Sequence, residues 1–236
     1  MDNFIKDISE LERNLGKAPS KERLEAAQEL LDVARQDLRS SKLNYEDGIF
    51  IFAASHLQQA VEKTAKAYYK ILGVLDDKTI RKTSHDSPEL FLRMVELPWA
   101  KKFGKFAGQF TGSDVITDTS EAQSVVDTQE KRAEIARLDA KQINSYLSLI
   151  PKLEETLVPL FSIMNKDLVM AMLRLYLLSG ITFPHEQYAR YTDSGLVKPK
   201  EYTAELGIIA AIETVWAETD AAISEVQRVI DSSRGQ

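Results

Sequence analysis

Apolar side chains recur along the chain at intervals of three and four residues, and alternation at intervals of two is almost absent. The first spacing places apolar residues on one face of an α-helix, whereas a half-buried strand needs the second. In residues 21–44, one such face consists of Leu24, Ala27, Leu31, Ala34 and Leu38. We therefore predict an all-α protein, an up-and-down helical bundle that packs through these faces.

A second helix is predicted for residues 49–71, after a turn at YEDG, residues 45–48. Its inward positions carry small and medium side chains, which allow neighbouring helices to approach closely. These positions are Ile49, Ala53, Leu57, Ala60, Thr64, Ala67 and Ile71. Gly73 is expected to follow the end of this helix, because glycine readily adopts the left-handed conformation found there.

A third helix is predicted to begin at Ser87, and Pro98 interrupts it. Residues 98–159 are expected to form a helical insertion, which contains the segment WAKKFGKFAGQF and a long helix over residues 121–150. The positions expected to be buried in that helix are Ile135, Leu138, Tyr146 and Leu149. The aromatic residues of the insertion fit packing on the bundle, a partner interface, or contact with nucleic acid or a membrane.

Two more helices complete the expected bundle. One is a buried helix over residues 160–179, and the other covers residues 203–230. The last helix is expected to bury Leu206, Ile209, Trp216, Ile223, Val226 and Ile230. We predict one domain over residues 21–236, preceded by an N-terminal extension of residues 1–20.

Composition narrows the choice of function. The chain has 236 residues, no cysteine, three histidines and a formal net charge of −6. The absence of cysteine excludes disulfides and thiolate chemistry, and no spacing of histidines predicts a metal site. The N-terminus lacks the apolar core of a signal peptide, and residues 168–180 look too short to cross a bilayer. We expect a cytoplasmic protein without a membrane contact, metal or cofactor.

Three segments together resemble one known family. Residues 34–73 contain an A-x-x-D-L start, a turn with glycine and then HLQQAVEKTAKAYYKILG; residues 84–96 read SHDSPELFLRMVE, and residues 188–205 read YARYTDSGLVKPKEYTAE. Their order and spacing resemble the HEPN domain family over about residues 24–97 and 160–230. The resemblance implies a bundle of four or five helices that commonly dimerises. Some members are metal-independent ribonucleases, whereas others bind nucleotides or pair with nucleotidyltransferases.

The ribonucleases of that family use an Arg-x(4–6)-His motif, which does not occur in this sequence. Arg81 and His85 have only three residues between them, and His185 precedes Arg190 in the reverse order. One residue of spacing rotates a helical side chain by about 100°, so a shortened motif changes the geometry. A ribonuclease would therefore need an atypical site built from Arg81, His85 or Arg190.

The polar side of the second helix is the first candidate binding site, and consists of Gln58, Gln59, Glu62, Lys63 and Lys66. In one interpretation the lysines bind phosphate and a glutamine binds a base edge or a backbone group. In the other, this side is solvated or holds a loop, and Glu62 and Lys66 form a surface ion pair at i, i+4. His56 is expected to be a satisfied interior or edge histidine.

Basic residues near a helix start form the second candidate. Arg81, Lys82 and His85 precede the third predicted helix, and backbone N–H groups at a helix start attract anions. Arg190 either clamps a phosphate with its guanidinium or pairs with Glu62 or Asp37 to close the bundle. The alternative for the first three residues is an ordinary surface loop.

The function that this sequence favours is binding without catalysis. We expect a HEPN-like protein that binds a nucleotide or a protein partner as a homodimer, in a toxin–antitoxin or nucleotidyltransferase-linked system. One alternative is a metal-independent endoribonuclease of the defence or toxin kind, with RNA as its substrate. The other is a purely structural interaction protein.

Overall fold

The computed structural model describes residues 19–73, 133–157, 165–185 and 197–235, and the regular elements in these ranges are all helices. The α-helices are α2 (Lys21–Glu46), α3 (Phe50–Leu72), α9 (Ala140–Leu147), α10 (Leu149–Leu157), α11 (Lys166–Thr182), α12 (Gly207–Ala210) and α13 (Ile212–Arg234). Two short 3₁₀ helices are η1 (Phe183–His185) and η3 (Pro199–Glu201). The predicted all-α class is confirmed.

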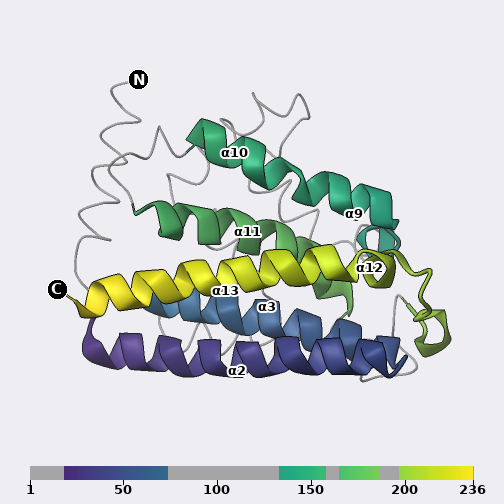
Figure 1. The fold of residues 1–236 in the computed structure, drawn as a ribbon, viewed down its shortest axis with the longest axis horizontal. Coiled ribbons are helices and arrows are strands. Elements are labelled where there is room, and N and C mark those ends of the chain that lie inside the picture. The colour runs from purple at the N-terminus through teal and green to yellow at the C-terminus, as the bar shows by residue number, and fades with distance from the viewer. Residues whose placement is uncertain (1–18, 74–132, 158–164, 186–196, 236) are drawn as a thin grey trace.

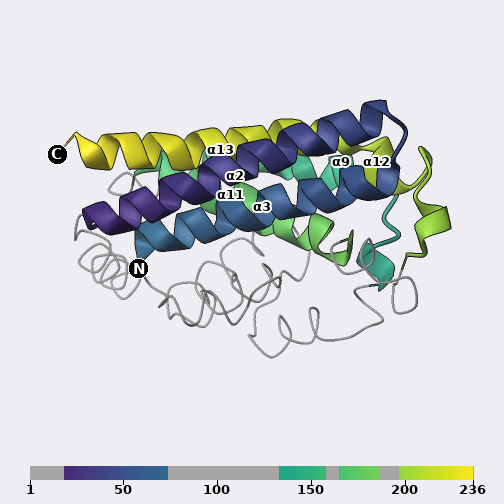
Figure 2. The ribbon, with the colours of Figure 1, turned by 90° about the horizontal axis from the view of Figure 1, so that it is seen from below.

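The long helices α2, α3, α11 and α13 lie lengthwise beside one another (Figure 1). Helices α2 and α3 form an antiparallel hairpin, α13 packs against both of them, and α11 packs against α3 and α13. Figure 2 shows α13, α2 and α3 in the same lengthwise arrangement from a perpendicular direction. The shorter α9 and α10 continue one another along α11. The described residues therefore form a helical bundle with one shared core.

The α2–α3 hairpin agrees closely with its predicted pattern. All five predicted inward positions of α2 are buried, as are all those of α3 except Ile49, which is 41% exposed. Ile49 lies in the connection just before α3, so it falls outside the packed seam. Gly48 and Gly73 have φ values of 73° and 60°, which places both in the left-handed region. Gly73 ends α3 as predicted.

One buried hydroxyl ties three helices of the bundle together. Oγ of Ser41 on α2 donates to the carbonyl oxygen of Ala53 on α3 at 2.7 Å. The same oxygen accepts a hydrogen bond from Nε1 of Trp216 on α13 at 2.8 Å. Tyr45 packs edge-on against Trp216 and at a tilt against Phe50. These contacts fix the position of α13 against the hairpin.

The single helix predicted over residues 121–150 is wrong in its described part, residues 133–150. A turn and an extended stretch interrupt it at residues 136–139, and Asp139 then starts α9 with a capping box made with Gln142. The interruption changes the helical phase, so the buried residues are Ala136, Ile143, Leu147 and Ile150. Of the predicted positions, Ile135, Leu138 and Leu149 are only half-buried, and Tyr146 is exposed.

Pro151 does not end a helix, because it lies in the first turn of α10, where a missing N–H leaves no bond unmade. The last predicted helix is also divided. Residues 203–206 form turns, α12 is a short helix, and α13 begins only after a turn at Ala211. Of its six predicted core residues, four are buried, and Leu206 and Trp216 are half-buried.

Helix α11 is more apolar than its neighbours and forms part of the core. The segment Lys166–His185 is long and apolar enough to cross a membrane, so the expectation that it is too short is wrong. However, 78% of it is buried inside the protein, and Arg174 in its middle pairs with carboxylates of α13. Burial of this kind is typical of a core helix in a bundle.

Several predicted segments lie outside the described residues. They include the third helix from Ser87, the aromatic and glycine residues of the insertion at 99–112, and most of the N-terminal extension.

Candidate functional site

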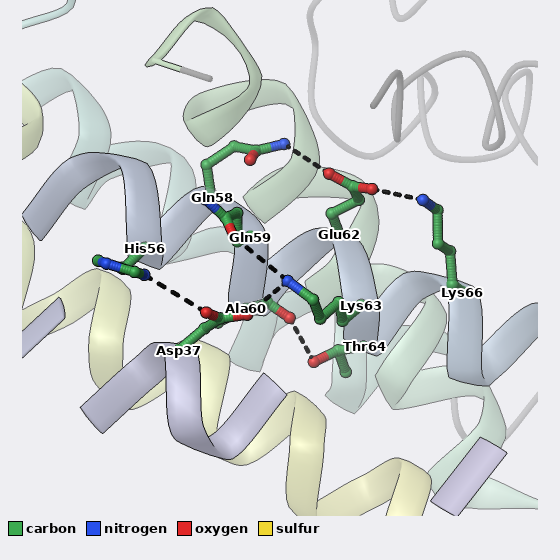
Figure 3. Close-up of polar contacts among 9 residues, drawn as sticks. All are labelled: Asp37, His56, Gln58, Gln59, Ala60, Glu62, Lys63, Thr64 and Lys66. Carbon is green, nitrogen blue, oxygen red and sulfur yellow. Dashed lines mark hydrogen bonds and ion pairs between the residues drawn. The ribbon is translucent and has the colours of Figure 1, made fainter. Parts of the chain in front are cut away.

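One polar row of α3, which consists of His56, Gln59 and Lys63, faces α2 and contacts the carboxylate of Asp37 there (Figure 3). Nζ of Lys63 lies 2.5 Å from Oδ2 of Asp37 on α2, and Nδ1 of His56 lies 3.3 Å from Oδ1 of the same residue. Nζ of Lys63 also donates to Oε1 of Gln59 at 3.4 Å. The Asp37 side chain is 13% exposed and that of Lys63 is 25% exposed. This row therefore connects α3 to α2.

The second polar row of α3 consists of Gln58, Glu62 and Lys66. It lies beside the first row on the helix surface and is more deeply buried. Nε2 of Gln58 donates to Oε2 of Glu62 at 3.4 Å, and Nζ of Lys66 forms an ion pair with Oε1 of Glu62 (Figure 3). Gln58 is fully buried and Glu62 is 5% exposed. Oε1 of Gln58 is a buried acceptor for which the described residues provide no hydrogen bond.

These contacts bear on the two interpretations of the lysines. One of them places Lys63 and Lys66 on phosphate, and in the structure each lysine pairs with a carboxylate of this chain. A phosphate at either lysine would have to compete with that carboxylate at short range. The Glu62–Lys66 ion pair is confirmed, although it is largely buried and not a surface pair. A ligand-binding role for the five α3 residues stays a prediction.

His56 is half-buried at the edge of the hairpin, as expected, and Asp37 is its partner. From the sequence, Asp37 is expected only as one of two alternative partners of Arg190. No local spacing indicates that Asp37 contacts Lys63, because the two residues lie 26 positions apart on different helices.

His185 at the end of α11 is the other described histidine. It is 2% exposed, and its Nδ1 lies 3.2 Å from the hydroxyl of Tyr202. Burial lowers the pKa of His185 to about 4, because the charged imidazolium loses its hydration inside the protein. At neutral pH this side chain is uncharged and shielded from solvent.

The remaining predicted site residues, Arg81, Lys82, His85 and Arg190, lie outside the described residues. Their proposed contacts with phosphate and with Glu62 or Asp37 stay predictions. Within the described ranges, no three His, Asp or Glu side chains are grouped so as to hold a metal ion.

The comparison with protein families gives one match. Residues 27–148, just over half of the chain, match the family model of the HEPN domain. The match includes most of α2 and all of α3 and α9. It also runs through residues 98–148, which were expected to lie outside the resemblance. No curated protein and no solved structure matches the chain.

Proposed function

The chain belongs to the HEPN domain family, and we propose that it acts by binding a protein partner or a nucleotide without cleaving RNA. The observation that carries this proposal is the absence of the Arg-x(4–6)-His motif from the whole sequence. Metal-independent RNA cleavage needs a base for the 2′-hydroxyl and a cation for the phosphorane in fixed geometry. The family's arrangement for supplying both is missing here.

The described histidines also support binding over catalysis. A general base must reach its substrate, yet His185 is buried against Tyr202. Nδ1 of His56 is directed at Asp37, and Lys63 shares that carboxylate. The contacts of both histidines are therefore explained by packing within the bundle.

A protein partner fits the described surface better than a nucleotide does. The lysines of α3 are paired within the chain, whereas large apolar side chains are exposed around the α2–α3 connection, at Leu43, Ile49 and Phe52. Neighbouring exposed apolar residues are a feature of protein interfaces. We propose a homodimer in the cytoplasm that pairs with a nucleotidyltransferase, as in a two-component or toxin–antitoxin system.

Two measurements separate the forms of this proposal. The first is co-expression with a nucleotidyltransferase from the same genome, followed by size-exclusion chromatography with light scattering, which should give a complex that contains both chains. Thermal unfolding with ATP, GTP and other nucleotides tests the second ligand class, since a ligand at 100 times its dissociation constant adds about 2.7 kcal/mol of stability. Failure of both would leave the purely structural role.

The ribonuclease alternative depends on Arg81, His85 and Arg190, which the described structure does not include. It predicts RNA cleavage in the presence of EDTA that is lost in the His85→Ala and Arg190→Ala proteins.

A further inference from the structure

A line of charged side chains joins α10, α11 and α13. Lys166 pairs with Glu154 at 2.8 Å, Arg228 pairs with Asp167 at 2.8 Å, and Arg174 pairs with both Glu218 and Glu225. The line contains four carboxylates and three cationic groups, so it carries one carboxylate in excess. Residues 158–164, between α10 and α11, contain no ionisable side chain that could balance it.

Glu225 is the carboxylate of this line with the least access to water. It is 5% exposed, and its Oε1 accepts a hydrogen bond from Nε of Arg174 at 2.9 Å. Its Oε2 is buried and has no hydrogen-bond partner among the described residues. Arg174 cannot neutralise it fully, because Nη1 of that guanidinium is engaged by Glu218.

A buried anionic oxygen without a donor is costly, and a proton on that oxygen removes the charge. Burial raises the pKa of Glu225 even though Arg174 and Arg228 lower it. The negative charge of Asp167 also raises the pKa of Glu225. Lys166, at the start of α11, interacts electrostatically with the same carboxyl group. The charge count and the burial thus point to the carboxyl group of Glu225, and the missing hydrogen-bond donor among the described residues selects its Oε2.

We propose that Oε2 of Glu225 is a proton-binding site between α11 and α13, and that the contact between these helices weakens when the proton leaves. Among the described residues, the other charged groups of this line are Arg174, Lys166 and Asp167 on α11, Glu218 and Arg228 on α13, and Glu154 on α10. Each of them has an opposite charge as its partner.

The direction of the pH effect follows from linkage. A carboxyl that holds its proton more tightly in the folded state stabilises the fold fully below its unfolded pKa, near 4.5. This contribution to stability is lost as the pH rises through the higher pKa that Glu225 has in the folded state. The α11–α13 contact should therefore weaken as the pH increases above about 4.5.

Replacing Glu225 by glutamine keeps the shape of the protonated side chain and removes its titration. We expect Glu225→Gln to match the wild-type melting temperature at pH 4.5 and to exceed it by about 2–4 °C at pH 8. Glu213→Gln, on an exposed position of the same helix, should show no such widening. A Glu225→Gln protein that is less stable than wild type by the same amount at every pH would overturn the proposal.

A second measurement uses the wild-type protein and therefore does not depend on whether the Glu225→Gln variant folds. Side-chain carboxyl resonances of wild-type protein with labelled glutamate report the titration of each carboxyl by NMR. We expect Glu225 to titrate at a higher pH than an ordinary glutamate. Titration of Glu225 at or below the ordinary value would show that Oε2 does not hold the proton.

Discussion

Nζ of Lys63 lies 2.5 Å from Oδ2 of Asp37, so this basic residue of the α3 motif forms an ion pair inside the helical bundle. The contact crosses from α3 to α2 and is largely shielded from water. A pattern that could be interpreted as a phosphate-binding face is, in the described structure, part of the contact between two helices. This side of α3 therefore contributes to the packing of the bundle, and its ligand-binding role stays a prediction.

Replacing Asp37 by asparagine should destabilise the protein, because Lys63 would remain half-buried without its counter-ion. We expect a loss of about 1.5–3 kcal/mol in the free energy of unfolding, measured by urea denaturation. The matched control is Asp32→Asn on the same helix, where Asp32 and Arg35 form an exposed pair. That change should cost less than about 1 kcal/mol, and equal losses would contradict the role given to Asp37.

The Ser41 hydroxyl joins α2, α3 and α13 through Ala53 and Trp216. Ser41→Ala would leave the partly buried indole N–H without its acceptor. We expect a loss of about 1–3 kcal/mol, measured by urea denaturation and by a change in tryptophan fluorescence. Ser40→Ala, one position away and only half-buried, should leave both nearly unchanged. A neutral Ser41→Ala would mean that Trp216 is held by packing alone.

Gly207 lets the start of α12 approach the residues before α9. A Cβ at Gly207 would lie 1.8 Å from the backbone oxygen of Leu138, which cannot move like a side-chain tip. Gly207→Ala should therefore lower the free energy of unfolding by about 2 kcal/mol or more. Gly180→Ala in α11 meets open space and should raise it by up to about 1 kcal/mol, because alanine favours the helix. Thermal unfolding distinguishes these opposite signs.

Acidification should destabilise the protein through His185. Burial lowers its pKa to about 4 from an ordinary value of 6.5, so the folded state binds the proton less well than the unfolded chain. Stability is complete above pH 6.5 and falls by about 3 kcal/mol between pH 6.5 and pH 4. A His185→Gln protein should lose this part of the slope, whereas His56→Gln should keep it. Identical slopes in all three proteins would contradict this prediction.

The hairpin could be predicted from sequence because its information is local. Leucine and alanine recur on one face of α2, small residues recur on α3, and Gly73 marks the end. Helix α9 was missed for an equally local reason. Asp139 and Gln142 form a capping-box pattern that indicates a new helix start. The apolar periodicity continues across this pattern and therefore predicts a single helix.

The partners of charged residues could not be predicted in the same way. Lys63 pairs with Asp37 across the hairpin, and Arg174 pairs with Glu218 and Glu225, which lie more than 40 residues later in the chain. Such pairs depend on how helices rotate and cross, which the spacing of residues within one helix does not specify. Sequence alone therefore located the polar side of α3 but not its internal contacts.

The central claim is that this HEPN-domain protein binds without cleaving RNA. Incubation of the purified full chain with RNA in EDTA, followed by a denaturing gel, tests it most directly. We predict that the RNA stays intact. Cleavage by the wild-type protein that disappears in the His85→Ala or Arg190→Ala protein would contradict the account.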